Sequence, residues 1–393
     1  MGFPIRRTEM NYLNVISKKY DRVLISAVIL LCIIGTVMLY SASSIRSLME
    51  SGNQTASLYL IAHLKRLLLG VIIMFLMMLF DYRHLKKYYL HLIFGAIGLL
   101  VITKAVFVIK GISTPARWFY LGPFSVQTSD IARLSLIIFL AAYIDKKQRQ
   151  LDDFYTGFLP PVFVIAILMS LVIIQPDFST AIMLGLIGLF MLFIGRANFS
   201  QLLATSVAGI ALAIPVLLMA PYRWERVRSW LNKNEDLSTI GYQAYQSLIS
   251  LGNGGFRGLG LGNSLEKNMF LPEPHTDFIF SIIGEEIGFI GTFFILTLFL
   301  LFFQRGIRIA KECTDPFGVM LAVGISFNFI LYAFVNAAVV TNVFPVTGLP
   351  MPLISYGGSA MVVNLASIGI LLNISQAKRS VAHSSDWKPK LYG

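Results

Sequence analysis

The sequence predicts an all-α membrane protein that crosses the bilayer about ten times, and three features of the chain support this. Hydrophobic residues make up 56% of the 393 residues and charged residues only 13%, whereas a soluble domain is about 25% charged. Apolar runs recur along the whole chain, and a bilayer core needs about 20 such residues per helix. The 32 Lys and Arg residues flank these runs instead of forming one basic face. These features exclude a soluble enzyme, a disordered chain and a disulfide-stapled secreted domain.

Ten apolar runs are the candidate transmembrane helices, and they lie near residues 23–43, 60–80, 89–109, 130–144, 158–175, 179–195, 199–219, 277–303, 316–340 and 354–375. With the N-terminus in the cytoplasm, most Lys and Arg residues fall in cytoplasmic segments, so the positive-inside rule predicts that both termini are cytoplasmic. The expected organisation is a cytoplasmic segment at 1–22, a transmembrane domain at 23–375 and a cytoplasmic tail at 376–393. A large extracytoplasmic loop at 221–276 separates the seventh and eighth spans.

This loop is the most informative polar segment, because long structured loops at a membrane face usually carry function. Near its start, Trp224, Val227 and Leu231 share one helical face, with arginines on the other faces. The pattern predicts an interfacial helix, which either only anchors in lipid or also presents guanidinium groups to phosphates. The glycine-rich segment Gly252–Ser264 follows. No strand precedes it, so we expect no dinucleotide site; the glycines either allow close backbone approach or expose amides to an anion.

Three carboxylates lie in or beside the eighth span. Asp277 stands at its outer mouth, and Glu285 and Glu286 lie about two and a half turns deeper. Carboxylates at such depth are costly unless they are paired or face a polar cavity, so a functional role is expected. The alternatives are an N-cap role for Asp277 and a structural ion pair between the glutamates and a basic residue such as Arg133.

Other polar features face the same side. The turn at Gln175–Thr180 places Asp177 where it could cap the following helix. The uncharged Pro345–Ser359 loop enters the last span, and irregular backbone at that depth lines a cavity or is covered by protein. Arg117 and Trp118 place a cation beside an aromatic ring.

Metal, thiol and nucleotide chemistry are not expected. Cys32 and Cys313 are far apart in the chain, and the five histidines are scattered without metal-ligand spacing. No Walker loop is present in the sequence, which argues against ATP as the energy source.

These motifs together resemble the SEDS family (shape, elongation, division and sporulation) of bacterial peptidoglycan polymerases, over nearly the whole span region. The segments that carry the resemblance are Ala116-Arg117-Trp118, Leu121-Gly122, Gln175-Pro176-Asp177, Gly241-Tyr242-Gln243, Gln246-Ser247, Pro272-Glu273, His275-Thr276-Asp277-Phe278, Gly284-Glu285-Glu286, Pro345–Gly348 and Ile354–Ser359. The segments Gly260–Ser264 and Leu271–His275 are more similar to the division branch (FtsW and its sporulation paralogue) than to the elongation branch (RodA).

The chain departs from the family's pattern at three places. Gln127-Thr128-Ser129-Asp130 stands where the family usually has Gln-Pro-Ser-Glu, which affects how the fourth span begins and keeps the carboxylate in a shorter form. Ser179 stands where a glycine is usual, and Ala360 where a second serine is usual.

The resemblance implies a glycosyltransferase that polymerises lipid II, a disaccharide-pentapeptide on a polyprenyl pyrophosphate, into glycan strands. It implies that Asp277 is the catalytic base for the acceptor hydroxyl. Arg117 and Lys267 are then candidates to hold the pyrophosphate, with Mg²⁺ as a further candidate although no metal site is certain. Trp118 would stack on sugar or support the cavity. The remaining substrate-binding candidates are Glu273, His275, Thr276 and Ser355, and Glu285 and Glu286 would support the catalytic aspartate from behind.

The resemblance also implies partners and a location. The partners are a class B penicillin-binding protein, which is a transpeptidase that cross-links the strands, and other septal division proteins; no nucleic acid is expected. The location is the bacterial cytoplasmic membrane, at the division septum. Two other functions stay open: a lipid II flippase that uses the same cavity for transport, and a non-catalytic division scaffold. The polar residues lie mostly on the outer side, which favours a site that works from outside over a transporter with two gates.

Overall fold

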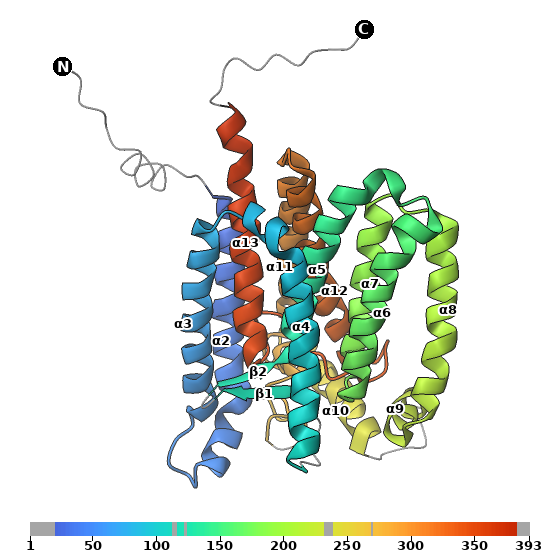
Figure 1. The fold of residues 1–393 in the computed structure, drawn as a ribbon. Helices are drawn as coiled ribbons and strands as arrows, with labels where there is room; N and C mark the ends of the chain where they lie inside the picture. The colour runs from blue at the N-terminus through green and yellow to red at the C-terminus, as the bar shows by residue number, and fades with distance from the viewer. Residues whose placement is uncertain (1–19, 112–115, 122–123, 232–238, 269, 383–393) are drawn as a thin grey trace, which may run out of the picture.

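The computed structural model describes residues 20–111, 116–121, 124–231, 239–268 and 270–382, and most of them are helical (Figure 1). The elements are α2 (Arg22–Glu50), α3 (Leu58–Leu79), α4 (Arg83–Ile109), β1 (Trp118–Leu121), β2 (Phe124–Gln127), α5 (Thr128–Lys147), η1 (Gln148–Gln150), η2 (Phe154–Phe158), α6 (Leu159–Ile174), α7 (Phe178–Ile194), α8 (Phe199–Leu218), α9 (Pro221–Leu231), α10 (Thr239–Gly254), α11 (Ile279–Glu312), α12 (Pro316–Val340) and α13 (Ser359–Ala382). Most of the predicted N-terminal segment and of the predicted tail, and Gly122 of one family motif, lie outside the described residues.

The expectation of a helical, polytopic membrane protein is confirmed. Within the described residues, eight helical stretches are long and apolar enough to cross a membrane, namely α2, α3, α4, η2 with α6, α8, α11, α12 and the first part of α13. The helix α7 is apolar but shorter, and α5 carries Asp130, Arg133 and Asp145. In the described part of the chain one helix occupies each predicted run, but ten crossings and cytoplasmic termini stay predictions.

Several helices extend beyond their apolar runs. α2 continues to Glu50 and α11 to Glu312, in both cases past the residues predicted to lie in lipid. The hydrogen bonds of a helix join backbone groups, so a helix can continue into water after its apolar side chains end. The last span shows the opposite difference, because α13 begins at Ser359, after the Gly357-Gly358 pair, and not at 354.

A small β-hairpin is the element that the all-α prediction lacks. β1 and β2 pair antiparallel, with Trp118 opposite Gln127 and Tyr120 opposite Ser125. Aromatic residues favour strands, but the segment is too short and too close to the next span for its alternation to be distinctive. Gln127 then leads directly into α5.

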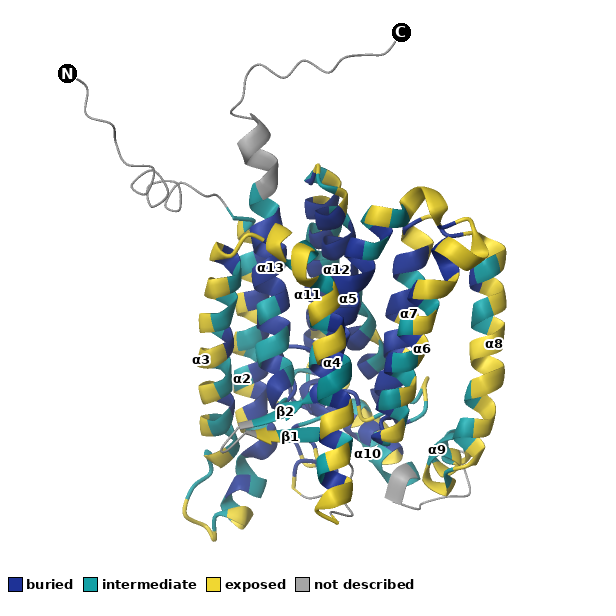
Figure 2. Ribbon diagram, viewed as in Figure 1, coloured by how far each residue is buried: buried dark blue, intermediate teal, exposed yellow. Residues whose placement is uncertain are grey.

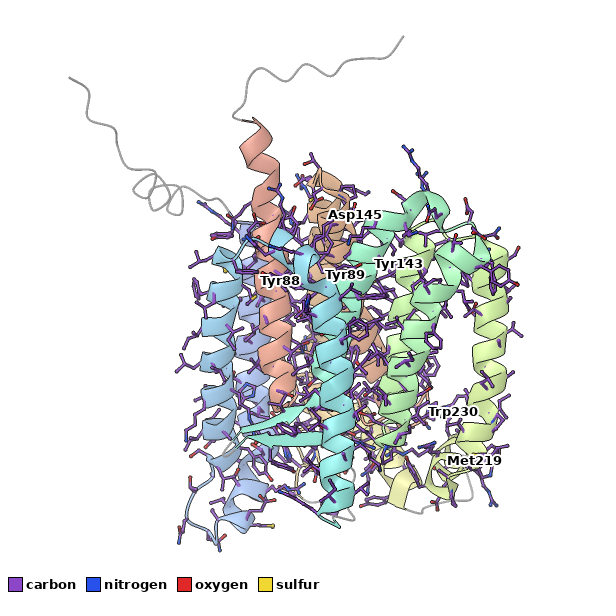
Figure 3. All side chains as sticks on the ribbon, viewed as in Figure 1. Tyr88, Tyr89, Tyr143, Asp145, Met219 and Trp230 are labelled. Atoms are coloured by element: carbon purple, nitrogen blue, oxygen red, sulfur yellow. The ribbon has the colours of Figure 1, made fainter. Side chains whose placement is uncertain are left out.

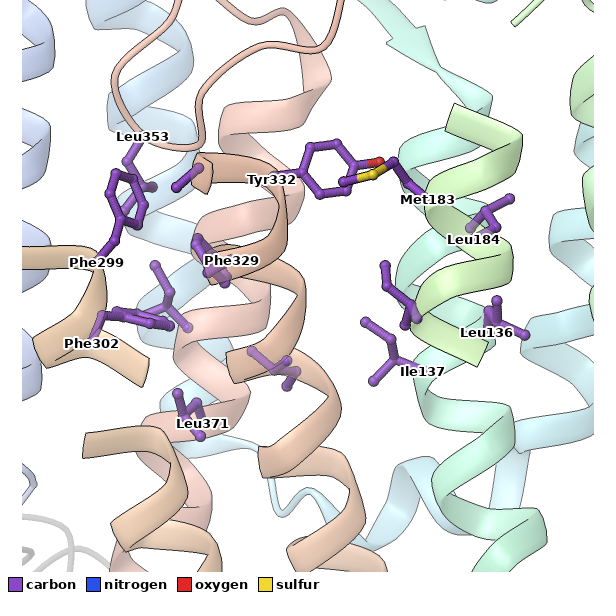
Figure 4. Close-up of a cluster of buried hydrophobic side chains, with 14 of the residues drawn as sticks. Leu136, Ile137, Met183, Leu184, Phe299, Phe302, Phe329, Tyr332, Leu353 and Leu371 are labelled. Carbon is purple, nitrogen blue, oxygen red and sulfur yellow. The ribbon is translucent and has the colours of Figure 1, made fainter. Parts of the chain in front are cut away.

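Among the eight candidate spans, α12 and α13 are the most buried, with 67% and 72% of the residues in their apolar windows inside the structure. Figure 4 shows Phe302 of α11 against Phe329 of α12, with ring centroids 4.6 Å apart and Leu371 of α13 nearby. At the periphery the buried share falls to 11% in α3 and 6% in α8 (Figure 2), and many of the exposed side chains of these two helices are large and apolar. Large exposed apolar faces of this kind suit contact with lipid.

The two ends of the bundle carry different elements. The start of α2 and the end of α13 lie at one end, and the hairpin, α9 and α10 lie at the other (Figure 1). Asp145 is seen at the first end and Trp230 at the second in Figure 3. Ion pairs Lys86–Asp145 and Arg305–Asp21 stabilise the first end, which the charge distribution predicts to be cytoplasmic.

Candidate active site

A cavity of about 390 Å³ lies at the end that carries the hairpin. Its walls come from α3, the hairpin, α5, α7, α12, α13, the residues just before α11 and the loop before α13. Five of the candidate residues line it: Arg117, Trp118, Thr276, Asp277 and Ser355. The Pro/Gly loop contributes Gly348 to Gly358 with few gaps, so irregular backbone at this depth does line a cavity.

Asp277 lines the cavity and is held by its neighbours. Thr276 Oγ1 donates to Asp277 Oδ1 at 2.6 Å, and Asn336 Nδ2 donates to the backbone oxygen of Asp277 at 2.7 Å. The N-cap of α11 is Phe278, without a side-chain capping bond, so the alternative that Asp277 caps this helix is wrong. Burial raises the pKa of the Asp277 carboxyl above its ordinary value, which makes its ionised form a stronger base.

The hairpin forms one wall and carries Arg117 and Trp118. The Arg117 guanidinium donates to the carbonyl oxygen of Pro176. A Cβ on Gly358 would lie 2.8 Å from the Trp118 ring, so only glycine allows the loop to pack this closely against the indole. Ser359 Oγ accepts a 2.7 Å hydrogen bond from Gln127 N, which fixes the hairpin to the start of α13.

The floor of the cavity holds a charged cluster that the candidate residues did not include. Arg133 lies 3.4 Å from Asp130, donates to Asn364 Oδ1 at 3.0 Å and stacks over Tyr332 at 4.4 Å. The signal was present in the sequence, because Asp130 and Arg133 stand one helical turn apart within an apolar run. Arg133 therefore pairs with Asp130 and not with the glutamates of α11, and the structural ion pair suggested for those glutamates is made instead by Lys267 with Glu286.

Asp177 caps α7 and also lines the cavity. Its Oδ1 accepts from Thr180 N at 3.3 Å at the start of α7, so the expected capping is confirmed. Its Oδ2 accepts from Gln127 Nε2 at 3.3 Å, and Asp177 also lines the cavity.

Lys267, Glu285 and Glu286 form a separate buried network beside the cavity. Lys267 Nζ lies 3.0 Å from Glu286 Oε1, and Ser41 of α2 donates to the same oxygen at 2.6 Å. Glu285 accepts from Ser264 Oγ, and from Leu265 N at 3.0 Å. None of the three lines the cavity. They bind the segment after the glycine-rich loop to α11 and α2.

The glycine-rich loop crosses α11 where that helix is interrupted. Gly288 has φ 76° and ψ −168°, and the loop supplies backbone bonds there, with Leu259 N donating to Glu285 O at 2.9 Å and Phe289 N donating to Gly255 O at 2.9 Å. A Cβ on Gly258 would lie 2.3 Å from Glu286 O. The expectation that these glycines allow close backbone approach is confirmed.

Glu273 and His275 do not line the cavity. Glu273 forms a 2.7 Å ion pair with Arg46 at the end of α2, and the His275 ring lies 4.4 Å from that of Tyr59. Burial lowers the pKa of His275 to about 4, so its ring is neutral at neutral pH. Tyr356 N donates to His275 O at 2.9 Å and so joins this segment to the cavity loop.

The candidate Mg²⁺ ion stays a prediction. In the described ranges no group of three or more His, Cys, Asp or Glu side chains could hold a metal ion. The cavity carboxylates are instead bound by neighbouring donors, as described for Asp130, Asp177 and Asp277.

Comparison with known proteins places the chain in a family. The cell cycle protein family of FtsW, RodA and SpoVE matches residues 21–380. The probable peptidoglycan glycosyltransferase FtsW of Trichlorobacter lovleyi is 38% identical over 357 residues, which cover 91% of this chain and 93% of the relative. Stage V sporulation protein E of Bacillus subtilis is 37% identical over 366 residues, which cover 91% of this chain and 98% of the relative.

A solved structure supports the same fold. It is described as the structural coordination of polymerization and crosslinking by a peptidoglycan synthase complex, and it superposes with a TM-score of 0.74 at 24% identity over 91% of this chain and 98% of that chain. The matched family and the FtsW and SpoVE relatives confirm the resemblance to the SEDS family and to its FtsW and SpoVE branch. This chain belongs to the FtsW, RodA and SpoVE family of cell cycle proteins.

Proposed function

We propose that this protein is a peptidoglycan glycosyltransferase that polymerises lipid II at the outer face of the bacterial cytoplasmic membrane during cell division. Relatives named as FtsW glycosyltransferases that align over nine-tenths of the chain support the reaction class. The observation that carries the proposal is Asp277, a carboxylate of raised pKa that lines a cavity together with Arg117. A base beside a cation suits a reaction in which a hydroxyl loses a proton and an anion departs.

The reaction balances with this chain's own groups. The 4-hydroxyl oxygen of one lipid-linked disaccharide attacks the anomeric carbon of another, and its proton passes to the Asp277 carboxylate. The bond between that carbon and the diphosphate oxygen breaks, and the electron pair leaves with the polyprenyl diphosphate. The leaving group is already a stable anion, so it needs cations more than a proton, and one carboxylate suffices where glycosidases use two.

The other candidate residues divide by position. Arg117, Trp118, Thr276 and Ser355 line the cavity and would contact substrate. Glu273 and His275 would position the Asp277 segment through Arg46 and Tyr59. Lys267, Glu285 and Glu286 would hold the glycine-rich loop on α11; the ammonium of Lys267 is engaged by Glu286, so it is a weaker candidate for the pyrophosphate than Arg117.

The partners follow from the reaction. A glycan strand gains strength only when it is cross-linked, so a class B penicillin-binding protein is the expected partner, and the similar solved structure is described as a complex that polymerises and crosslinks. Placement at the division septum, together with other septal proteins, is part of this proposal, and membership of a family of cell cycle proteins supports it.

The test is glycan-strand formation from lipid II by the full-length protein with its partner transpeptidase, followed on gels. Asp277→Asn is expected to abolish strands, because an amide cannot accept the proton. Asp145→Asn is the matched control, since Asp145 lies at the opposite end of the bundle in an ion pair with Lys86 (Figure 3). Strands from Asp277→Asn at the wild-type level would refute the assignment, and passage of lipid II across sealed vesicles without polymer would favour a flippase.

A further inference from the structure

We propose that Arg226 of α9 joins Arg117 and Thr347 in a binding site for the diphosphate of the lipid-linked substrate. This inference rests on the proposed glycosyltransferase function and adds the group that receives the leaving anion. Arg226 was not among the candidate residues, and the interfacial helix that carries it could have been only a membrane anchor.

The helix α9 is docked on the loop that lines the cavity. Trp230 Nε1 donates to Asn342 O at 3.1 Å, and Arg226 Nη1 donates to Val346 O at 3.3 Å. Val346 is buried and is followed by Thr347 and then by Gly348, which lines the cavity. The docking therefore holds the Arg226 guanidinium against the segment that leads into the cavity-lining loop, although Arg226 and Thr347 do not themselves line the cavity.

The other two arginines of α9 do not contact the cavity-lining loop in this way. Arg223 Nη1 donates to Val216 O at 2.9 Å, and its guanidinium stacks 5.5 Å from the Phe178 ring. Arg228 is exposed. Only Arg226, among the three described arginines of this helix, donates to the cavity loop.

Arg117, Arg226 and Thr347 each carry a buried hydrogen-bond donor without a partner within the described residues, namely Arg117 Nε, Arg226 Nε and Thr347 Oγ1. A buried donor without an acceptor costs free energy, and native structures rarely retain several of them together. An anion with several oxygens would satisfy all three, and guanidinium groups bind phosphate oxygens through paired N–H donors.

The electrostatics support the same ligand. Burial, and then the positive charge of Arg117, lower the pKa of Arg226 below its ordinary value, although the Asp277 carboxylate opposes the shift. Arg226 stays protonated at any physiological pH, so Arg117 and Arg226 present two like charges to each other. A divalent diphosphate between them would relieve this repulsion, and it suits the pair better than a monoanion does.

The proposed diphosphate site lies close to Asp277, as the proposed reaction requires. A Cβ on Gly348, the residue after Thr347, would lie 3.6 Å from Asp277 Oδ2. The proposed diphosphate site and the proposed base are therefore close neighbours across one segment of the loop. Cations placed where the leaving group gains charge stabilise the transition state more than the ground state.

The test separates binding from turnover. Binding of a polyprenyl diphosphate and of the corresponding monophosphate is measured by native mass spectrometry for the full-length protein in nanodiscs of neutral lipid, in the Asp277→Asn background. We expect Arg226→Gln to weaken diphosphate binding about tenfold or more and to abolish the preference over monophosphate. Arg226→Lys is expected to keep part of the affinity, and the exposed control Arg228→Gln all of it. Thr347→Val should give a smaller loss than Arg226→Gln.

Equal diphosphate affinity of Arg226→Gln and its parent, at the same melting temperature, would overturn the inference. Phosphatidylglycerol added to the nanodiscs provides the second arm: displacement of the diphosphate from the parent protein would identify a phospholipid head group as the occupant and also overturn it. Because no turnover is needed, failure of the site is distinguishable from failure of the proposed function, which the strand assay for Asp277→Asn decides.

Discussion

At the residue scale, the central feature is a carboxylate whose surroundings favour its protonated form. Asp277 is two residues before α11, accepts a hydrogen bond from Thr276 and lines the cavity. Its position in a family motif and at the mouth of an apolar run was enough to select it from the sequence. Arg226 could not be selected in this way, because its partner Val346 is 120 residues further along the chain.

The pH dependence of polymerisation follows from two side chains. Burial raises the pKa of Asp277, so the base is ionised above that pKa and is lost as the pH falls through it. Burial lowers the pKa of His275 to about 4, so this ring stays neutral between about pH 5 and pH 8. We therefore expect the initial rate of strand synthesis to fall only on the acid side, along a single-proton curve.

The matched measurement is the same pH–rate profile for His275→Gln. Its acid limb should have the same midpoint as that of the wild type, with only the height of the curve changed. A wild-type limb that disappears in His275→Gln would assign the titration to the histidine and contradict the role given to Asp277.

The Asp277→Asn substitution is not expected to lower the stability of the folded protein at neutral pH. A carboxyl whose pKa is raised by folding destabilises the folded state once the pH exceeds its ordinary value of 3.8. At neutral pH the Asn variant should therefore unfold at a temperature no lower than the wild type, and loss of activity cannot then be attributed to misfolding.

At the element scale, the interruption of α11 and the loop that crosses it form one unit. Gly258 and Gly288 both have positive φ, of 79° and 76°, and their backbones are in contact. Close backbone approach was one of two interpretations of the glycine-rich segment, and its partner was not predicted, because Gly288 lies inside an apolar run that is typical of a continuous helix. The hairpin was missed for a related reason, since strands of four residues leave little periodicity.

Gly258→Ala should lower stability by at least about 2 kcal/mol, because the new Cβ meets backbone and the left-handed φ is strained. Gly252→Ala is the matched control, since a Cβ there meets nothing within 4 Å and alanine favours the helix. Thermal unfolding in detergent measures both. Equal melting temperatures for the two variants would mean that the loop does not lie on α11 as described.

At the scale of the whole molecule, apolar runs and their flanking charges predicted a polytopic helical protein. They did not predict which helices pack at the centre of the bundle and which lie at its periphery. Lipid and protein interior are equally apolar, so the runs do not tell a central helix such as α12 from a peripheral one such as α8. The role of the buried Asp130–Arg133 pair was also not predictable from the sequence. Charged residues inside an apolar run indicate a polar cavity, but they do not indicate which other residues line that cavity.

The predicted orientation can be measured with single cysteines in a chain whose Cys32 and Cys313 are replaced. A cysteine at exposed Tyr120 of the hairpin should react with a membrane-impermeant maleimide added outside intact cells. A cysteine at exposed Arg149, at the other end, should react only after the membrane is opened. The reverse pattern would place the cavity on the cytoplasmic side and exclude the proposed reaction there.

The central claim is that the carboxylate of Asp277 drives glycan polymerisation. The most direct measurement is the rate of lipid II consumption by purified wild type, Asp277→Asn and Asp145→Asn, each with the partner transpeptidase and at saturating lipid II. We expect Asp277→Asn to lose at least about 100-fold in rate at an unchanged melting temperature, and Asp145→Asn to keep the wild-type rate. A rate for Asp277→Asn within a few-fold of wild type would contradict the account.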